Sequence, residues 1–304
     1  MFELPDAAEL VKTYISKHVL HNEALLKMFE LPNAEELVKI YIPKYSFCDK
    51  AELRLFELPN AAEMIKIYVS TYCLSHEAQL KMLGQPNVAE LLKVYASHSY
   101  LWEDIKIFEL PNAAELVKIY IAKRGLSRKA QLKMLELPNV AELLKIYVSN
   151  DNGNYLCDEA ELKMLELPNA IELVKIYVSE YYLSGGAQLK MLELPNAAEF
   201  VKIYVSKDSF FEEVQLKMFE LPNAAELVKI YVSEHRLGVQ AQLKLFELPN
   251  AAEMIKMYVS KYCLCRGAQL KLIKFPNLRE VLDMQTSKWG LSKEARLEMQ
   301  NSLK

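Results

Sequence analysis

Residues 57–83 read ELPNAAEMIKIYVSTYCLSHEAQLKML, and close variants of this stretch of 27 residues follow one another along the chain. A proline opens each copy, at Pro5, Pro32, Pro59, Pro86, Pro111, Pro138, Pro168, Pro195, Pro222, Pro249 and Pro276. Successive prolines lie 27 residues apart, except for one interval of 25 residues and one of 30. A fixed period of this length is typical of repeat proteins. The sequence therefore predicts ten full repeats and a divergent eleventh, forming a single domain over residues 1–304 with no linker.

Each repeat carries the signals of two short helices. Proline cannot continue a helix interior, so the Leu-Pro pair ends one helix. In the third repeat, Asn60 is a preferred N-cap, and Glu63 completes a capping-box pattern for a helix over residues 61–72. Ser75 is expected to cap a second helix over residues 76–83. Serines fill the same position at Ser127, Ser184 and Ser292.

The helical faces predict how the repeats pack. In the first helix of the third repeat, Glu63, Lys66 and Ser70 form one narrow polar stripe, and most other positions are apolar. Such a short helix must contact several neighbours, which a stacked array provides. We therefore expect an all-α, right-handed αα-superhelix (an α-solenoid) of about eleven two-helix repeats. The repeats begin near residues 2, 29, 56, 83, 108, 135, 165, 192, 219, 246 and 273.

Three kinds of side chain recur at fixed places in the repeats. A tyrosine at the centre of the apolar face of the first helix is predicted to be a core residue. A glutamine in the second helix either bonds loop backbone between repeats or lines a polar groove. Charged residues of opposite sign lie three positions apart, as in Glu63/Lys66 and Lys133/Glu136, and are expected to form solvated pairs within one helix. The tyrosines are Tyr14, Tyr41, Tyr68, Tyr95, Tyr120, Tyr147, Tyr177, Tyr204, Tyr231 and Tyr258, and the glutamines are Gln79, Gln131, Gln188, Gln215, Gln242 and Gln269.

The two ends of the array differ in sequence. Residues 273–304 replace apolar positions with polar ones, among them Arg279, Glu280 and Asp283, and are predicted to form a C-terminal cap. The first repeat starts with an ordinary repeat junction over residues 1–5, so its first helix is expected to expose an apolar face. The sequence therefore predicts self-association through the N-terminal repeat.

This organisation resembles the bacterial HEAT-like repeats, and in particular it is similar to the leucine-rich-repeat variants. The likeness lies in the capped first helix over residues 59–65, the short connection over residues 70–75 and the second helix with Glu77-Ala78-Gln79-Leu80. It covers the whole chain as a plan and not as a signature, because the repeat is a few residues longer than the variant repeat. The resemblance implies a binding scaffold and no particular ligand.

The repeats differ most where the first helix passes into the second. Two residues before the recurring Leu or Phe vary freely from repeat to repeat. These pairs are His18-Val19, Tyr45-Ser46, Tyr72-Cys73, Ser99-Tyr100, Arg124-Gly125, Asn154-Tyr155, Tyr181-Tyr182, Asp208-Ser209, His235-Arg236 and Tyr262-Cys263. Either this edge is exposed and has drifted neutrally, or a rigid framework displays diversified residues for recognition. The first residue of each pair falls on the buried side of the helix, so its tyrosines are also candidates for the core.

Both changes of repeat length fall in the same zone. The fourth repeat loses two residues around Trp102-Glu103-Asp104, and the sixth gains residues 151–153. Such an irregularity is either a tolerated change or a deliberate bend of the array. Trp102 is a candidate anchor for a partner, because exposed aromatic residues are enriched in binding hot spots.

Composition and motifs argue against several classes of function. A net charge of −3 and a pI of about 6.1 disfavour general binding of phosphate backbones. No apolar run reaches the roughly 18 residues of a membrane span, and the N-terminus lacks the basic and apolar regions of a signal peptide. We therefore expect a cytoplasmic protein, with a secreted effector as the alternative. The five scattered cysteines indicate reduced thiols. Phosphate loops, metal-ligand spacings and nucleophile motifs are missing, so we expect no cofactor, no metal and no catalysis.

The sequence thus predicts a non-catalytic scaffold that binds a protein or peptide through its variable junctions. The first alternative is a modular nucleic-acid-binding repeat protein in which one repeat reads one nucleotide of RNA or DNA. The second alternative is a structural protein that assembles through its N-terminal edge.

Overall fold

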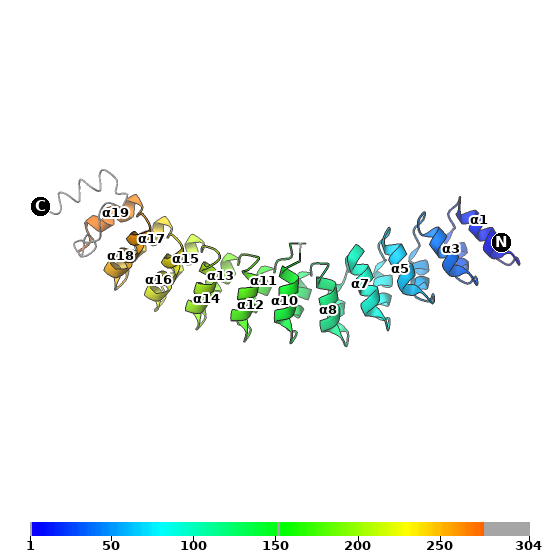
Figure 1. Cartoon of the computed structure of the whole chain (residues 1–304), viewed down its shortest axis with the longest axis horizontal. Coiled ribbons are helices and arrows are strands. Elements are labelled where there is room, and N and C mark those ends of the chain that lie inside the picture. Colours follow the sequence, from blue (N-terminus) through cyan, green and yellow to red (C-terminus); the bar gives the residue numbers. More distant parts are fainter. Residues whose placement is uncertain (1, 151–152, 277–304) are drawn as a thin grey trace. The chain divides into compact units, whose positions relative to one another are not determined.

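The computed structural model describes residues 2–150 and 153–276. All regular structure in these residues is helical, with 19 α-helices, two 3-10 helices and no strand. The chain divides into two compact units, residues 1–155 and residues 156–304. Within each unit, many helices pack in neighbouring pairs, an arrangement compatible with the α-solenoid plan (Figure 1). The all-α prediction is confirmed.

In the N-terminal unit, the first helices of successive repeats (the A helices) pack on one another in chain order. They are α1 (Ala7–Ile15), α3 (Ala34–Tyr41), α5 (Ala61–Val69), α7 (Val88–His98), α8 (Ala113–Ile121) and α10 (Val140–Val148). The second helices (the B helices) form another row. They are α2 (Asn22–Met28), α4 (Asp49–Leu55), α6 (His76–Leu83), the 3-10 helix η1 (Asp104–Glu109) and α9 (Arg128–Met134). The 3-10 helix stands in the repeat that is two residues short, where an α-helix was expected.

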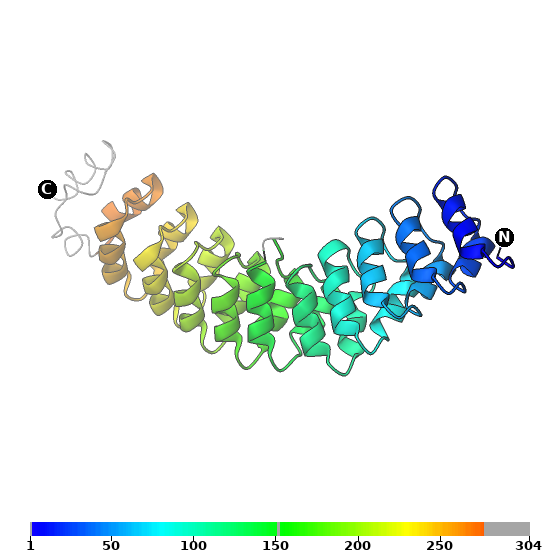
Figure 2. The same ribbon diagram turned by 45° about the vertical axis from the view of Figure 1, so that its right-hand side comes forward.

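The C-terminal unit repeats this arrangement, and the order of its helices can be followed in Figure 2. Its A helices are α12 (Ala170–Tyr177), α14 (Ala197–Val205), α16 (Ala224–Glu234) and α18 (Ala251–Lys261). Its B helices are α11 (Asp158–Glu166), α13 (Gly185–Glu193), α15 (Glu212–Met218), α17 (Val239–Lys244, continued by the 3-10 helix η2, Leu245–Glu247) and α19 (Arg266–Ile273). Each row packs on itself, and α11, α13 and α15 also contact the A helix that follows them. Apart from residues 273–276, the predicted C-terminal cap lies outside the described residues.

The capping residues predicted from the sequence form their hydrogen bonds in B helices and not in A helices. The hydroxyl of Ser75 accepts a hydrogen bond from the N–H of Ala78, and Ser127 and Ser184 cap their helices in the same way. The capping box predicted for the A helices is wrong, since the Asn60 side chain makes no capping hydrogen bond. Its backbone lies at φ −104° and ψ 44°, away from the extended conformation of a capping residue. A turn supplies the first bond instead, as in the third α-helix, where the N–H of Ala34 donates to the carbonyl of Leu31.

The tyrosines form the centre of the core, as predicted. Nine of the ten, from Tyr41 to Tyr258, are at most 1% exposed. Tyr14 departs from this prediction and is 39% exposed, because no repeat precedes α1 among the described residues. Several of the buried tyrosines also bond to the junction of the repeat before them. The hydroxyl of Tyr68, for example, accepts from the N–H of Phe47 in the preceding repeat at 3.4 Å. The tyrosines therefore join successive repeats as well as the two helices of one repeat.

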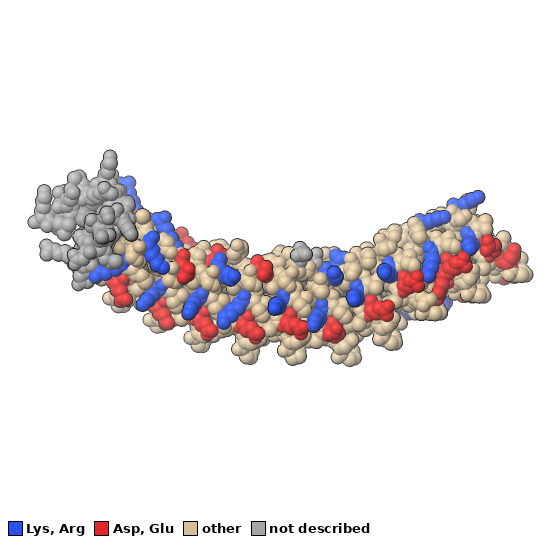
Figure 3. All heavy atoms as spheres, in the orientation of Figure 1, with Lys and Arg blue, Asp and Glu red and all other residues tan. Residues whose placement is uncertain are grey.

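The charged residues pair both within and between repeats (Figure 3). Three predicted pairs of the B row are confirmed, Lys133 with Glu136 at 2.8 Å, Lys190 with Glu193 at 4.0 Å and Lys244 with Glu247 at 2.8 Å, whereas in the described chain no ion pair joins Lys27 and Glu30. The predicted partners in A helices are wrong for Lys12 and Lys39, which bind the glutamates of the next repeat, Glu36 at 2.6 Å and Glu63 at 2.9 Å. Neighbouring A helices lie side by side, which brings these charges together.

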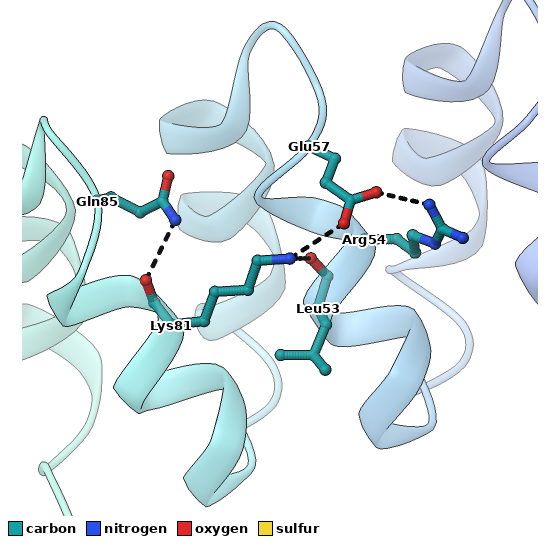
Figure 4. Close-up of polar contacts among 5 residues, drawn as sticks. All are labelled: Leu53, Arg54, Glu57, Lys81 and Gln85. Atoms are coloured by element: carbon teal, nitrogen blue, oxygen red, sulfur yellow. Dashed lines mark hydrogen bonds and ion pairs between the residues drawn. The ribbon is translucent and has the colours of Figure 1, made fainter.

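The B row combines both kinds of pairing (Figure 4). Glu57 binds Arg54 of its own repeat at 2.7 Å and Lys81 of the next repeat at 3.1 Å. Lys81 also donates to the carbonyl of Leu53, at 2.9 Å. These side chains are between 32% and 49% exposed, so each pair adds little stability. The pairs leave a charge-balanced surface.

Candidate functional site

The variable residues predicted from the sequence lie along one edge of each unit, between every A helix and its B helix. We call this strip the junction edge. Its two variable positions differ in their surroundings. The first residue of a pair is mostly half-buried, whereas the second is mostly exposed. The two positions are therefore suited to different roles.

The tyrosines at the first position are packing residues. Tyr45 lies 5.1 Å from Tyr41 between ring centroids, and Tyr72 lies 5.4 Å from Tyr68. Tyr181 and Tyr262 lie in the same way against the core tyrosines of their repeats, at 5.7 Å and 5.4 Å. Such ring pairs stabilise a fold beyond the area that they bury. These tyrosines are half-buried, so they pack against the core from its margin and are not part of its buried centre.

Other first-position residues bond to the preceding repeat. Arg124 Nε donates to the carbonyl of Ala96 at 2.7 Å, and His235 Nε2 lies 2.6 Å from the carbonyl of Val205. Because a carbonyl only accepts, Nε2 of His235 carries the proton. Both carbonyls belong to the C-terminal end of the preceding A helix, where backbone groups lack helical partners.

The remaining first-position residues make weaker contacts. The Ser99 hydroxyl lies 3.4 Å from Cys73 Sγ, and Asp208 accepts from the hydroxyl of Tyr204 at 3.4 Å. Asn154 is half-buried, and His18 is exposed in the first repeat. With the tyrosines, Arg124 and His235, these contacts show that the first position mostly packs on its own repeat or bonds to the preceding one.

The second position carries the exposed part of the junction edge. Val19 is 58% exposed, Tyr100 55%, Tyr155 66% and Tyr182 71%. Ser46, Cys73, Ser209, Arg236 and Cys263 are also exposed, and Gly125 is half-buried. Contiguous exposed apolar patches are typical of surfaces that bind partners, whereas single scattered apolar residues are ordinary on a protein surface.

Three further exposed apolar residues follow the recurring Leu or Phe. Trp102 is 72% exposed, Phe211 58% and Val239 55%. Six of the eleven exposed large apolar side chains in the described residues thus lie on the junction edge, four in the N-terminal unit and two in the C-terminal unit, and Val239 begins the B helix next to that edge. Sequence analysis named Trp102 and missed Phe211 and Val239. Phe211 directly follows Phe210 as Trp102 follows Leu101, and this shared position was the available signal.

Buried glutamines fix the backbone of the junction edge. The Nε2 of Gln242 donates to the carbonyl of Leu237 in its own junction, at 2.9 Å. Its Oε1 accepts from the N–H of Cys265 in the next repeat, at 2.6 Å. Gln188 and Gln215 bridge two junctions in the same way. The prediction that the glutamines bond loop backbone between repeats is confirmed.

Carboxylates take the place of the glutamine in three repeats, a feature that sequence analysis missed. Glu52, Asp104 and Glu161 are at most 5% exposed. Glu52 accepts from the Tyr68 hydroxyl and from the N–H of Ser75, both at 2.7 Å. The burial and the neighbouring carboxylate raise the pKa of the Tyr68 hydroxyl, and burial raises the pKa of Glu161. These residues occupy a fixed place between repeats and are therefore structural.

The opposite edge of the A helices carries the Leu-Pro-Asn turns. A cavity of about 460 Å³ lies there between the turns of two repeats, lined by residues that include Pro111, Lys118 and Glu142. Lys118 and Glu142 pair across it, which raises the pKa of the lysine and lowers that of the glutamate. The residues of these turns are nearly the same in every repeat, so this edge does not vary as the junction edge does.

Two further observations concern the chemistry of the chain. Within residues 2–150 and 153–276, no group of three or more His, Cys, Asp or Glu residues could hold a metal ion. No helix in that part of the chain is long and apolar enough to cross a membrane.

No protein-family model, no curated protein and no solved structure matches the chain. The likeness to HEAT-like repeats therefore rests on the plan of paired helices.

Proposed function

We propose that the chain is a non-catalytic α-solenoid scaffold that binds a protein or peptide partner through its junction edge. In this proposal the repeats form a right-handed αα-superhelix of eleven two-helix units on the HEAT-like plan. The observation that carries it is the concentration of exposed apolar side chains on the edge where the repeats differ. The framework beneath is held by buried tyrosines and glutamines, so a partner would meet a preformed surface.

The charge pattern favours this function over nucleic-acid binding. Lys12, Lys39 and Lys118 of the A helices pair with glutamates of the next repeat, and several lysines of the B row, among them Lys133 and Lys244, pair with glutamates three residues later. Binding of a phosphate backbone requires lysines or arginines that release counterions, and paired lysines meet that requirement poorly.

The test compares the intact chain with a variant whose second-position residues are all serine, which repeats two and eight already carry at Ser46 and Ser209. A random peptide library displayed on phage is selected against both proteins. We expect peptides that bind the intact chain and not the serine variant, at equal melting temperature. Selection of the same peptides by both proteins, or of none by either, would contradict the proposal. Salt-dependent binding of random single-stranded RNA or DNA by the intact chain alone would instead indicate a nucleic-acid reader.

One observation favours a second function, assembly through the N-terminal repeat. Leu10 is 37% exposed and Tyr14 39%, although the tyrosine at this position in nine other repeats is buried. A second copy of the chain covering this face would bury it. Light scattering tests this: a mass that rises with protein concentration, and stays monomeric in Tyr14→Ser, is expected. A mass that does not change with concentration would exclude assembly.

A further inference from the structure

The exposed indole of Trp102 lies on the ring of a titratable residue from the preceding repeat. The Trp102 ring is stacked on the His76 ring, with centroids 6.0 Å apart and an interplanar angle of 10°. His76 is the first residue of α6, and in the described chain the other B α-helices begin with Asn, Asp, Arg, Gly, Glu or Val. Trp102 is the one tryptophan of the described residues. This histidine–tryptophan pair is therefore specific to the boundary between the third and fourth repeats.

The backbone of Trp102 is fixed, whereas its side chain depends on His76. The N–H of Trp102 donates to Oε1 of the buried Gln79 at 2.8 Å. The residue is nonetheless 72% exposed, and the ring that it stacks on is that of His76. A change in His76 should therefore alter how firmly the indole is held without moving the backbone.

A positive charge on His76 strengthens two contacts at once. Its Nε2 lies 2.8 Å from a carboxylate oxygen of Glu103, the residue after Trp102. This nitrogen is out of contact with solvent and has no other hydrogen-bond partner among the described residues. The charged ring forms an ion pair there, and a cation within about 6 Å of an indole ring is attracted by the face of that ring. The neutral ring has one N–H and no net charge, so it holds Glu103 and Trp102 less firmly.

The elements around α6 bring other charged or titratable side chains to this end of the repeats, namely Asp49, Lys50, Glu52, Glu77, His98 and Asp104. The buried Glu52 and Asp104 accept hydrogen bonds from the next repeat, and His98 Nδ1 lies 3.0 Å from the carbonyl of Val94. Asp49, Lys50 and Glu77 are exposed, so water screens their charges. Glu103 is thus the charged group that lies within ion-pair distance of His76.

We propose that His76 is a pH-sensitive switch that holds the Trp102 ring at acid pH and frees it at alkaline pH. Histidine ordinarily gains or loses its charge between pH 5 and pH 8. Trp102 stays exposed in both states, and its freedom to move is what changes. The effect on binding rests on the proposed function: a side chain that is already held loses less entropy when a partner binds, so acid pH favours a partner that contacts Trp102.

The test follows Trp102 in the full chain without any partner. The chain has two tryptophans, so Trp289→Phe leaves Trp102 as the reporter, and the fast decay of its fluorescence anisotropy measures motion of the ring. We expect the amplitude of this decay to rise in one transition between pH 5 and pH 8, and the transition to be lost in His76→Gln. Glu103→Gln should lower the midpoint by about 0.2–0.7 pH units, the range for an exposed ion pair. His98→Gln removes the other histidine of this region and is the matched control, with the transition unchanged.

Several outcomes separate this inference from the proposed function. An amplitude that stays constant between pH 5 and pH 8, or that changes as much in His76→Gln as in the parent, would overturn the switch. A midpoint that Glu103→Gln leaves unchanged would show that the ion pair does not drive it. A chain that selects no peptide contradicts the proposed function, and the anisotropy still decides the switch because no partner is present. Since the side chains of His76 and Glu103 are 43% and 42% exposed, both variants are expected to keep the circular dichroism spectrum of the parent.

Discussion

The carboxylate of Glu161 accepts a hydrogen bond from the N–H of Ser184, one repeat further along, at 2.8 Å. The Ser184 side chain also hydrogen-bonds this carboxylate. The same match recurs wherever a carboxylate replaces the buried glutamine, with Glu52 opposite Ser75 and Asp104 opposite Ser127. In the described residues, a glutamine at this place accepts from the N–H of a residue of the next repeat that is not serine. The pairs are Gln79–Trp102, Gln188–Phe211, Gln215–Gly238 and Gln242–Cys265. At Asp104 the carboxylate accepts from both the N–H and the hydroxyl of Ser127, which gives a physical reason for the pairing.

A double-mutant cycle on this pair should show coupling. Ser184→Ala removes the helix cap and the hydroxyl donor, and is expected to cost about 1–2 kcal/mol. In a Glu161→Gln background the cost of Ser184→Ala should fall by about 1 kcal/mol, because the anion that the hydroxyl serves is absent. Hydrogen exchange of the α13 amides measures the local free energy of opening. If the free-energy costs of Ser184→Ala and Glu161→Gln add up to the cost of the double variant within about 0.3 kcal/mol, the two side chains are not coupled.

The pairing of a buried carboxylate with a serine of the next repeat can also be tested at a place where the chain has a glutamine. Gln188→Glu alone is expected to destabilise the repeat pair at neutral pH, since Phe211 offers only its N–H to the new charge. Adding Phe211→Ser should recover about 1 kcal/mol or more of that loss by supplying the hydroxyl. Phe211→Ser alone, on the exposed edge, is the control and should change stability little.

Burial of Glu161 also predicts a dependence of stability on pH. The folded pKa of this carboxyl is raised, so the folded state keeps its proton at a pH where the unfolded chain has lost it. The stability that Glu161 contributes is therefore fully present below the unfolded pKa and is lost as pH rises through the folded pKa. Between about pH 4 and pH 7, the melting temperature of Glu161→Gln should rise relative to the parent. Ile171→Val changes no ionisable group, and its difference from the parent should not move with pH.

The fold was largely predictable because the repeat makes each local signal occur many times. A recurring proline predicted the helix pairs, a recurring tyrosine predicted the core, and a glutamine present in six repeats predicted the bonds between junctions. The capping-box prediction was wrong because the Leu-Pro-Asn turn holds the Asn60 backbone outside the extended φ/ψ region that a capping residue adopts. The predicted partners of Lys12 and Lys39 were wrong because neighbouring A helices pack side by side, which brings a glutamate of the next repeat within reach.

The candidate site was less predictable, because exposure at the junctions depends on the neighbouring repeat. Tyr181 and Tyr182 are adjacent and identical in sequence, yet one packs on Tyr177 and the other is 71% exposed. A cavity of about 330 Å³ on the junction edge is lined by residues of three successive repeats, among them Trp102, Gly125 and Asn154. No single repeat carries that information, although the shortened fourth repeat marked the place.

The glutamine bridges predict a large cost for losing one of them. Gln215 is 6% exposed, donates to the carbonyl of Phe210 at 2.8 Å and accepts from the N–H of Gly238 at 2.7 Å. Gln215→Leu leaves both backbone groups without these partners, and we expect a cost of about 2–4 kcal/mol. Leucine fits the shape, since Leu25 holds this position in the first repeat and is 2% exposed. The amide of Gly238 should exchange its hydrogen faster in Gln215→Leu than in the parent, because it has lost its acceptor. The exposed Gln240→Leu is the control, and equal exchange in the two variants would contradict the bridge.

The two adjacent tyrosines of the seventh repeat allow structure and recognition to be tested apart. Tyr181→Ala removes a ring that lies 5.7 Å from Tyr177, so it should destabilise the C-terminal unit by about 1 kcal/mol or more. Tyr182→Ala removes a side chain that is 71% exposed and should change stability by less than about 0.5 kcal/mol. If the junction edge binds the partner, Tyr182→Ala should nonetheless weaken the binding of selected peptides that contact this repeat. Thermal unfolding and peptide titration of both variants give the four values needed. Neutral drift of the edge predicts instead that Tyr182→Ala changes neither stability nor binding.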